Sequence, residues 1–356
     1  MDAIVGLLET RGHSLDVDTI DRVRYLHMPR ALSAISVFLF TRSYVGEPVQ
    51  CWLPKQFTSF WEQYVETYCL IEGSYYVNVN ATNMPQAAEE KRKIIYYQWI
   101  PFIVLSIAAA LYIPRSFWRQ YQKKSGLDVS SVATDLKKRA KQLADTKIHL
   151  DSSRFSSNLW AAILFHKIFS LIIIALLLFM LEHFFGVGWA LEQTVNFFRG
   201  VEWHESAQFP RVTFCDAEVR EMGGQVHTWT VQCVLMVNMF NEKIFFGIWW
   251  ALIIVFTLTA VNILEWIFFL LNRTEQKRII MALVDRKKRT SKTLEEAFVT
   301  YIMRRSGASF IRLLSFSVSH FEMEEVVRPL WEDYLTAREK KTDGDDDKPF
   351  IDDDDL

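Results

Sequence analysis

The sequence predicts an all-α membrane protein with four transmembrane helices. Three observations support this prediction: four apolar stretches separate polar segments, Lys and Arg are concentrated in alternate segments, and all four cysteines lie in the remaining two loops. Half of the 356 residues are hydrophobic, but the mean hydropathy is only +0.06. The average alone would suit a soluble protein, so the prediction depends on how the residues are distributed.

The four apolar stretches differ in strength. Three of them, at residues 94–114, 161–191 and 244–271, are long enough to cross about 30 Å of hydrocarbon as helices. The first stretch, at residues 31–45, is the weakest because it is short and contains Arg42 and three serines. Its length would also suit a core helix. We count it as a span because it makes the topology even and puts all cysteines on one side.

The basic residues orient these spans. Residues 115–160 carry 10 Lys or Arg against 4 acids, and residues 273–292 carry 8 against 2. Such segments stay in the cytoplasm. The loops at residues 46–93 and 192–243 carry more acids than bases, so we expect them outside a plasma membrane, with both termini inside. Residues 1–30 have no apolar core of the kind found in a cleaved signal peptide.

The four cysteines fall in the two loops predicted to be outside. Cys51 and Cys69 lie in the first loop, and Cys215 and Cys233 lie in the second. An oxidising compartment allows disulfides there, and four cysteines permit three connectivities. Bridges between the loops would hold them as one cap, whereas bridges within each loop would leave them independent.

Several motifs resemble those of the innexins, the invertebrate gap-junction proteins. The segment Tyr96-Tyr97-Gln98-Trp99-Ile100-Pro101 resembles the family signature, with Ile100 where the family usually has Val. Both outer loops are similar to those of the family around their cysteines, for example at Cys51-Trp52 and at Phe209-Pro210-Arg211-Val212. The likeness runs from about residue 18 to residue 331, and the cytoplasmic loop and tail diverge most. Met28-Pro29 stands where a Thr commonly opens the first span.

The resemblance implies a subunit of a large-pore channel that assembles as a homo- or hetero-oligomer, an octamer. Two such hemichannels of adjacent cells would dock through the outer loops, forming a gap junction for ions and small metabolites. The resemblance also implies the disulfide pairs Cys51–Cys233 and Cys69–Cys215. Membrane lipid and a second hemichannel are the expected partners.

Two segments are candidates for the pore wall. Ser33, Ser36, Phe40 and Ser43 are spaced by 3, 4 and 3 residues, which puts them on one face of a helix. A polar face suits a water-filled pore, although serines also bond to the preceding turn or pack between helices.

The N-terminal segment is the second candidate. The resemblance implies that this segment folds into the pore as a funnel, where a ring of acids would favour cations. Its acids are Asp2, Glu9, Asp16, Asp18 and Asp21. A solvated terminus is the alternative.

The remaining segments carry weaker signals. Asn80-Ala81-Thr82 is a glycosylation sequon, and a glycan there would obstruct docking. Glu182-His183 is an ionisable pair within the third span, a candidate proton sensor or a self-satisfied pair. We expect residues 115–160 and 272–338 to form a helical cytoplasmic dome. Residues 339–356 form an acidic tail with too few apolar residues to fold, so we expect it to be disordered.

Other function classes have less support. A net charge of −2 argues against nucleic-acid binding by global positive charge. No phosphate-binding glycine loop, His-Glu-x-x-His or Gly-x-Ser-x-Gly motif occurs, so we expect no enzyme, no catalytic residues, no metal and no cofactor. The alternatives are a non-junctional release channel similar to the pannexins, and a four-span adhesion or scaffold protein without conduction.

Overall fold

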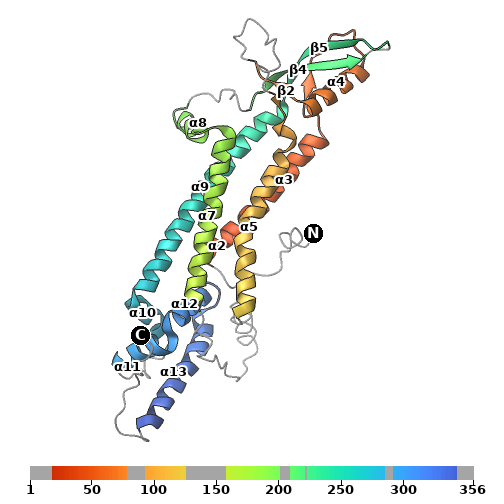
Figure 1. The fold of residues 1–356 in the computed structure, drawn as a ribbon. Coiled ribbons are helices and arrows are strands. Elements are labelled where there is room, and N and C mark those ends of the chain that lie inside the picture. The colour runs from red at the N-terminus through yellow and green to blue at the C-terminus, as the bar shows by residue number, and fades with distance from the viewer. Residues whose placement is uncertain are drawn as a thin grey trace. The chain divides into compact units, whose positions relative to one another are not determined.

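The computed structural model describes residues 18–77, 93–125, 158–200, 209–220, 223–284 and 292–342. The chain forms two compact units, one of Met1–Tyr25, Ile113–Leu171 and Leu258–Leu356, the other of Leu26–Tyr112 and Ile172–Thr257. Figure 1 labels their elements. Asp2, Glu9, Asp16, Asn80, most of the cytoplasmic loop and residues 343–356 of the acidic tail lie outside the described residues, whereas residues 339–342 are helical.

Three helices in the described part of the chain are long and apolar enough to cross a membrane. They are α5 (Ile100–Ser125), α7 (Leu159–Phe185) and α9 (Met236–Leu271). Each one covers much of a stretch from which a span was predicted, and each contributes residues to both units. The 36 residues of α9 correspond to about 54 Å at ~1.5 Å per residue, which is longer than the roughly 30 Å thickness of a hydrocarbon core.

The first predicted span forms part of a longer helical segment. It begins with α2 (Thr19–Arg22), continues through one π-helical segment, η1 (Val23–His27), and ends with α3 (Met28–Tyr44). Proline at position 29 would clash with the carbonyl of residue 25 in a regular α-helix, and residue 25 lies in the wider π-helical segment η1. The 17 residues of α3 cover only about 25 Å, so its role as a fourth span stays a prediction.

The two cysteine-containing loops form a sheet, so the all-α prediction is wrong there. The five strands β1 (Gln50–Cys51), β2 (Ser74–Tyr75), β3 (Lys93–Ile94), β4 (Val212–Arg220) and β5 (Val226–Val234) lie in the order β1-β5-β4-β2-β3. All their pairings are antiparallel. A signal was present in the sequence, since the β-branched residues Val226, Thr228 and Thr230 alternate with other residues after Gly223-Gly224. Both glycines have positive φ, 115° and 84°, which favours glycine in a tight turn.

The unit that contains this sheet has two apolar cores. One lies between the helices and includes Leu39, Val104, Leu111, Ile174 and Leu252, all nearly inaccessible to solvent. The other lies between the sheet and α4 (Ser59–Glu72) and includes the four cysteines, Val65 and Ala217. In Figure 1, α4 lies beside the β4–β5 hairpin. The loop residues therefore fold on their own apolar core.

The second unit is helical in its described part. After α9 the chain forms α10 (Arg273–Ala282), α11 (Lys292–Ala297), the π-helical η5 (Phe298–Met303), α12 (Arg304–Ser315) and α13 (His320–Thr342). Phe298 and Trp331 are fully buried, and their rings meet edge to face at 5.0 Å. An apolar core thus stabilises helices in the stretch predicted to be helical.

Candidate functional site

The two predicted outer loops are joined by two disulfides. Cys51 is bonded to Cys233, and Cys69 is bonded to Cys215. These are the pairs that the resemblance implied. The strand register places Cys51 directly opposite Cys233, while α4 and β4 carry the other two cysteines. The two bonds link cysteines that are 182 and 146 residues apart in the sequence. Bringing such distant residues together costs conformational entropy, and a covalent bond reduces this cost by restricting the unfolded chain.

The joined loops expose large aromatic side chains. Trp52 is 74% exposed and Phe60 is 81% exposed, although both belong to the ordered sheet-and-helix body. Trp229 on β5 meets Phe57 edge to face at 5.2 Å. Exposed apolar groups on a covalently stapled scaffold indicate an interaction surface.

The signature residues connect this body to α5. The Tyr97 hydroxyl donates to the carbonyls of Cys69 and Leu70 at 3.0 and 3.1 Å, and the Gln98 amide also donates to Leu70. These carbonyls belong to the last turn of α4, where carbonyls commonly lack intrahelical partners, and the Cys69 carbonyl also accepts from the Gly73 N–H at 3.2 Å. Tyr96 packs edge to face on Phe209, while Trp99 is 61% exposed. The signature therefore positions the joined loops.

The serine stripe of α3 is not a single exposed face. Ser36 is buried and donates to the carbonyl of Pro101 at 2.8 Å, so it packs between helices. Ser33 and Ser43 are half-buried, and only Phe40 is exposed. The pore-lining interpretation is therefore wrong for Ser36. The hydroxyl satisfies its hydrogen-bonding capacity on α5, an alternative that the spacing alone left open.

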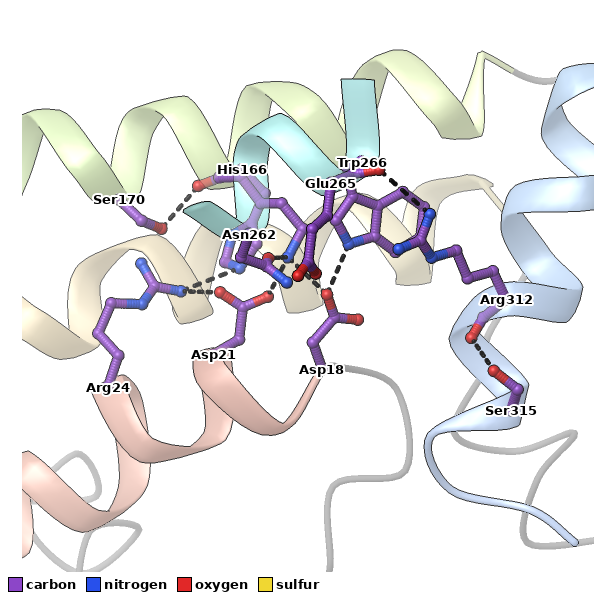
Figure 2. Close-up of polar contacts among 11 residues, drawn as sticks. Asp18, Asp21, Arg24, His166, Ser170, Asn262, Glu265, Trp266, Arg312 and Ser315 are labelled. Atoms are coloured by element: carbon purple, nitrogen blue, oxygen red, sulfur yellow. Dashed lines mark hydrogen bonds and ion pairs between the residues drawn. The ribbon is translucent and has the colours of Figure 1, made fainter. Parts of the chain in front are cut away.

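A buried ionic cluster lies in the other unit and joins three segments (Figure 2). Lys167 of α7 donates to Asp18 Oδ2 at 2.8 Å, Asp21 Oδ2 at 2.9 Å and Asn262 Oδ1 at 2.5 Å. An ammonium group has three donors, so every one is used. The Lys167 and Asp18 side chains are each 1% exposed. Uncompensated charges at such depth would be very costly.

Further contacts complete the cluster. Arg24 donates to Asp21 Oδ1 at 3.0 Å, so two carboxylates face two cations. The indole of Trp266 donates to Asp18 Oδ2 at 2.6 Å, and the Arg312 guanidinium lies 4.7 Å from the centre of that ring. Burial acts to raise the pKa of Asp21, but the attraction of Lys167 and Arg24 outweighs it and lowers that pKa below its usual value of 3.8. Asp21 therefore stays ionised at neutral pH.

The hydrogen-bonding pattern also assigns the form of His166. Arg24 Nη2 lies 3.2 Å from His166 Nε2. Since a guanidinium only donates, Nε2 accepts and the imidazole is neutral with its proton on Nδ1. The cluster therefore holds His166 as an acceptor for Arg24.

Helix geometry explains why these residues meet. Asp21 and Arg24 are three residues apart, and Asn262 and Trp266 are four apart, so each pair lies on one helix face. Asp18 is the residue before α2, where a carboxylate also suits the helix dipole. The start of α2 with the first turn of η1, one face of α7 and one face of α9 thus supply the hydrogen-bonded cluster, and Arg312 of α12 packs on its Trp266 ring.

The cluster corrects one expectation and reveals a missed site. Asp18 and Asp21 were expected among the acids of a pore funnel, but they are 1% and 3% exposed and pair with Lys167. Their charge is neutralised, so they cannot form an open acidic ring. Lys167 was missed, although a cation inside the predicted span 161–191 is itself a signal of a functional or structural partner.

The other ionisable candidates have local roles. Glu182 accepts from the backbone N–H of Gly188 at 3.0 Å, so it stabilises the turn after α7. His183 stacks on Phe179. Within the described part of the chain, Glu182 and His183 therefore contact different groups rather than each other.

Comparison with known proteins agrees with this architecture. The sequence pattern of the Innexin family matches residues 17–334. The chain is similar to Innexin-17 of Caenorhabditis elegans, at 36% identity over 90% of this chain and 94% of that protein. It is also similar to Innexin-16, at 34% identity with 89% of each chain covered, and to Innexin unc-9, at 30% with 92% and 94% covered, both of the same organism. With matches of this length and identity, the chain belongs to the innexin family of gap-junction channel proteins.

Proposed function

We propose that this chain is a subunit of a large-pore channel that passes ions and small metabolites between adjacent cells. The subunits assemble around a central axis as a homo- or hetero-oligomer, an octamer. The two disulfide-joined loops face outside, both termini lie in the cytoplasm, and the loops of one hemichannel dock with those of another.

The observation that carries this proposal is the covalent union of the two loops. Both disulfides connect one loop to the other, and the sheet takes strands from both. A preorganised surface loses less conformational entropy on association than two independent loops would. The exposed Trp52 and Phe60 supply apolar contact area on that surface.

The exposed face of α3 is the proposed pore wall in place of the serine stripe. Ala34, Val37 and Thr41 are exposed and spaced by three and four residues, so they share one face. A cysteine at Thr41 should react with a charged thiol reagent from the aqueous side and change the conductance. A cysteine at the buried Ser36 is the matched control and should be unreactive. Equal reaction at both positions would contradict this assignment.

The ionic cluster anchors the short helix that follows the N-terminal segment. Asp18 and Asp21 bind side chains of α7 and α9, so the chain is fixed in position directly after residues 1–17. We propose that Asp2 and Glu9 line the pore entrance. Replacing them by Asn and Gln should reduce cation preference, read from reversal potentials in a salt gradient. Unchanged potentials would contradict their role.

Electrical and dye-transfer recordings from single and paired cells test the channel proposal. Dye transfer and junctional current between paired cells would support docking. Currents in single cells without transfer would indicate a non-junctional release channel. Correctly assembled oligomers that stay silent in both assays would indicate an adhesion or scaffold protein.

The sequon provides a further comparison. If a glycan at Asn80 prevents docking, Asn80→Gln should increase dye transfer between paired cells. Equal and strong coupling by both forms would dismiss a glycan block.

A further inference from the structure

The short helix α8 (Trp189–Phe198) directly follows the membrane-spanning helix α7. Only Gly186, Val187 and Gly188 separate them, and both glycines have positive φ, 97° and 87°. Such values favour glycine, and Glu182 accepts the Gly188 N–H at 3.0 Å. The chain thus turns sharply where α7 ends.

One side of α8 is held by the rest of its unit. Trp189 and Ala190 are buried in the apolar core. The Trp250 indole donates to Thr194 Oγ1 at 3.2 Å, and the rings of Phe197 and Phe246 lie 6.4 Å apart. Contacts with α9 therefore fix the rotation of α8.

The remaining circumference of α8 divides into an apolar and a polar face. Leu191, Val195 and Phe198 are 60%, 44% and 76% exposed, and their spacing of four and three places them on one face. Glu192 and Asn196 lie on the neighbouring face, four residues apart. A helix with adjacent apolar and polar faces suits a boundary between hydrocarbon and water.

The apolar face continues an exposed apolar flank of α7. Ile172, Leu176, Phe179 and Met180 are 50–67% exposed on α7, and Val187 in the turn is 94% exposed. Exposed apolar residues on a span match hydrocarbon. Since α8 begins where this flank ends, its apolar face lies at the end of the spanning segment.

We propose that α8 is an interfacial helix that binds the lipid surface of the membrane at the end of α7. Leu191, Val195 and Phe198 enter the boundary between headgroups and acyl chains, while Glu192 and Asn196 face water. The inference rests on α7 spanning the membrane and is independent of docking between cells.

Spin labels on the full-length protein in phosphatidylcholine vesicles test this proposal. The chain has no free cysteine, because all four are in disulfides, so Val195→Cys and Phe198→Cys can be labelled specifically. Glu192→Cys is the matched control on the polar face. Accessibility to oxygen, which enters hydrocarbon, is compared with accessibility to a water-soluble nickel chelate. The oxygen-to-nickel ratio should be about tenfold higher at positions 195 and 198 than at 192.

Two results would overturn the proposal. Equal ratios at all three positions would place the apolar face in water. Low accessibility to both reagents at positions 195 and 198 would show that protein, such as a neighbouring subunit, covers it. Leu191→Cys provides another apolar position if a label at Phe198 disturbs folding, with size-exclusion chromatography as the check of assembly.

Discussion

Replacing Lys167 by Met should release the N-terminal helix. Methionine keeps a similar length and volume but removes the ammonium group. Asp18 and Asp21 would then be two buried carboxylates without the cation that lies 2.8 and 2.9 Å from them. The expected result is local opening of α2 and η1 rather than loss of the apolar core, because the cluster lies where these segments meet α7 and α9.

The magnitude follows from the geometry. At an effective dielectric constant of about 20, one pair at 2.8 Å has an attraction of about 6 kcal/mol before desolvation is subtracted. Removing one partner of a buried pair typically costs about 3–5 kcal/mol, since the other charge stays buried. At ~1.4 kcal/mol per factor of ten, the open population should rise about 100- to 4,000-fold.

Limited proteolysis measures this opening. Arg24 is 1% exposed, so trypsin cleaves after it only when the helix opens. With reclosing faster than cleavage, the rate follows the open population. Lys277→Met is the control, because Lys277 is 23% exposed and pairs with Glu295 and Glu296 at 3.4 and 3.2 Å. Partly exposed pairs contribute at most about 1 kcal/mol, so this variant should accelerate cleavage about fivefold or less.

A cleavage rate in Lys167→Met no higher than in Lys277→Met would refute the reasoning. The double variant Lys167→Met/Asp18→Asn provides a further check, because Asp21 keeps its pair with Arg24 and the second substitution removes the charge of Asp18, which Lys167 compensated. It should be cleaved more slowly than Lys167→Met alone. If it is cleaved faster, the cost does not arise from unpaired charge.

Three further predictions follow from the cluster and the joined loops. Non-reducing peptide mapping should recover Cys51 linked to Cys233 and Cys69 linked to Cys215, whereas a Cys51–Cys69 peptide would contradict the pairing. Because the pKa of folded Asp21 lies below its usual 3.8, the stabilisation from its charge is present above pH ~4 and is lost as the pH falls through the folded value. The difference in Tm between the wild type and Asp21→Asn should therefore stay constant from pH 8 to 5 and shrink below pH 4, and a change already between pH 7 and 5 would argue against the assignment. Gly73→Ala should lower the Tm of the protein by destabilising the α4 terminus by about 1–3 kcal/mol, since φ is +87° and a Cβ would lie 2.9 Å from Ile95 Cγ1, whereas Gly247→Ala, with open space around it, should have little effect.

Local patterns in the sequence predicted the features that depend on segment composition. Long apolar stretches predicted α5, α7 and α9, because crossing hydrocarbon requires a certain length and apolarity. The position of all four cysteines in two predicted outer loops indicated disulfide bonds. Several motifs indicated the family to which the chain belongs. The Gly223-Gly224 pair is also typical of a hairpin turn, whereas the cysteines alone did not predict a sheet in these loops.

Other features depend on which faces of distant segments meet. The spacing of Ser33, Ser36, Phe40 and Ser43 identified a helix face but not its neighbour, and Pro101 of α5 takes the Ser36 hydroxyl. The sequence showed that Asp18 and Asp21 are charged but not which group they pair with. Their partner Lys167 is 146 residues or more away in the sequence and contacts them only in the folded chain.

The sequence by itself determined that this chain crosses a membrane, that it is an innexin and that its cysteines belong to two loops. These properties follow from composition and motifs within single segments. Only the tertiary structure decided that the loops share one sheet, that α2 is anchored by buried charges and which face of α3 stays exposed. Hydrogen bonds and ion pairs act over a few ångströms, so their partners are selected by the packing of segments that lie far apart in the chain.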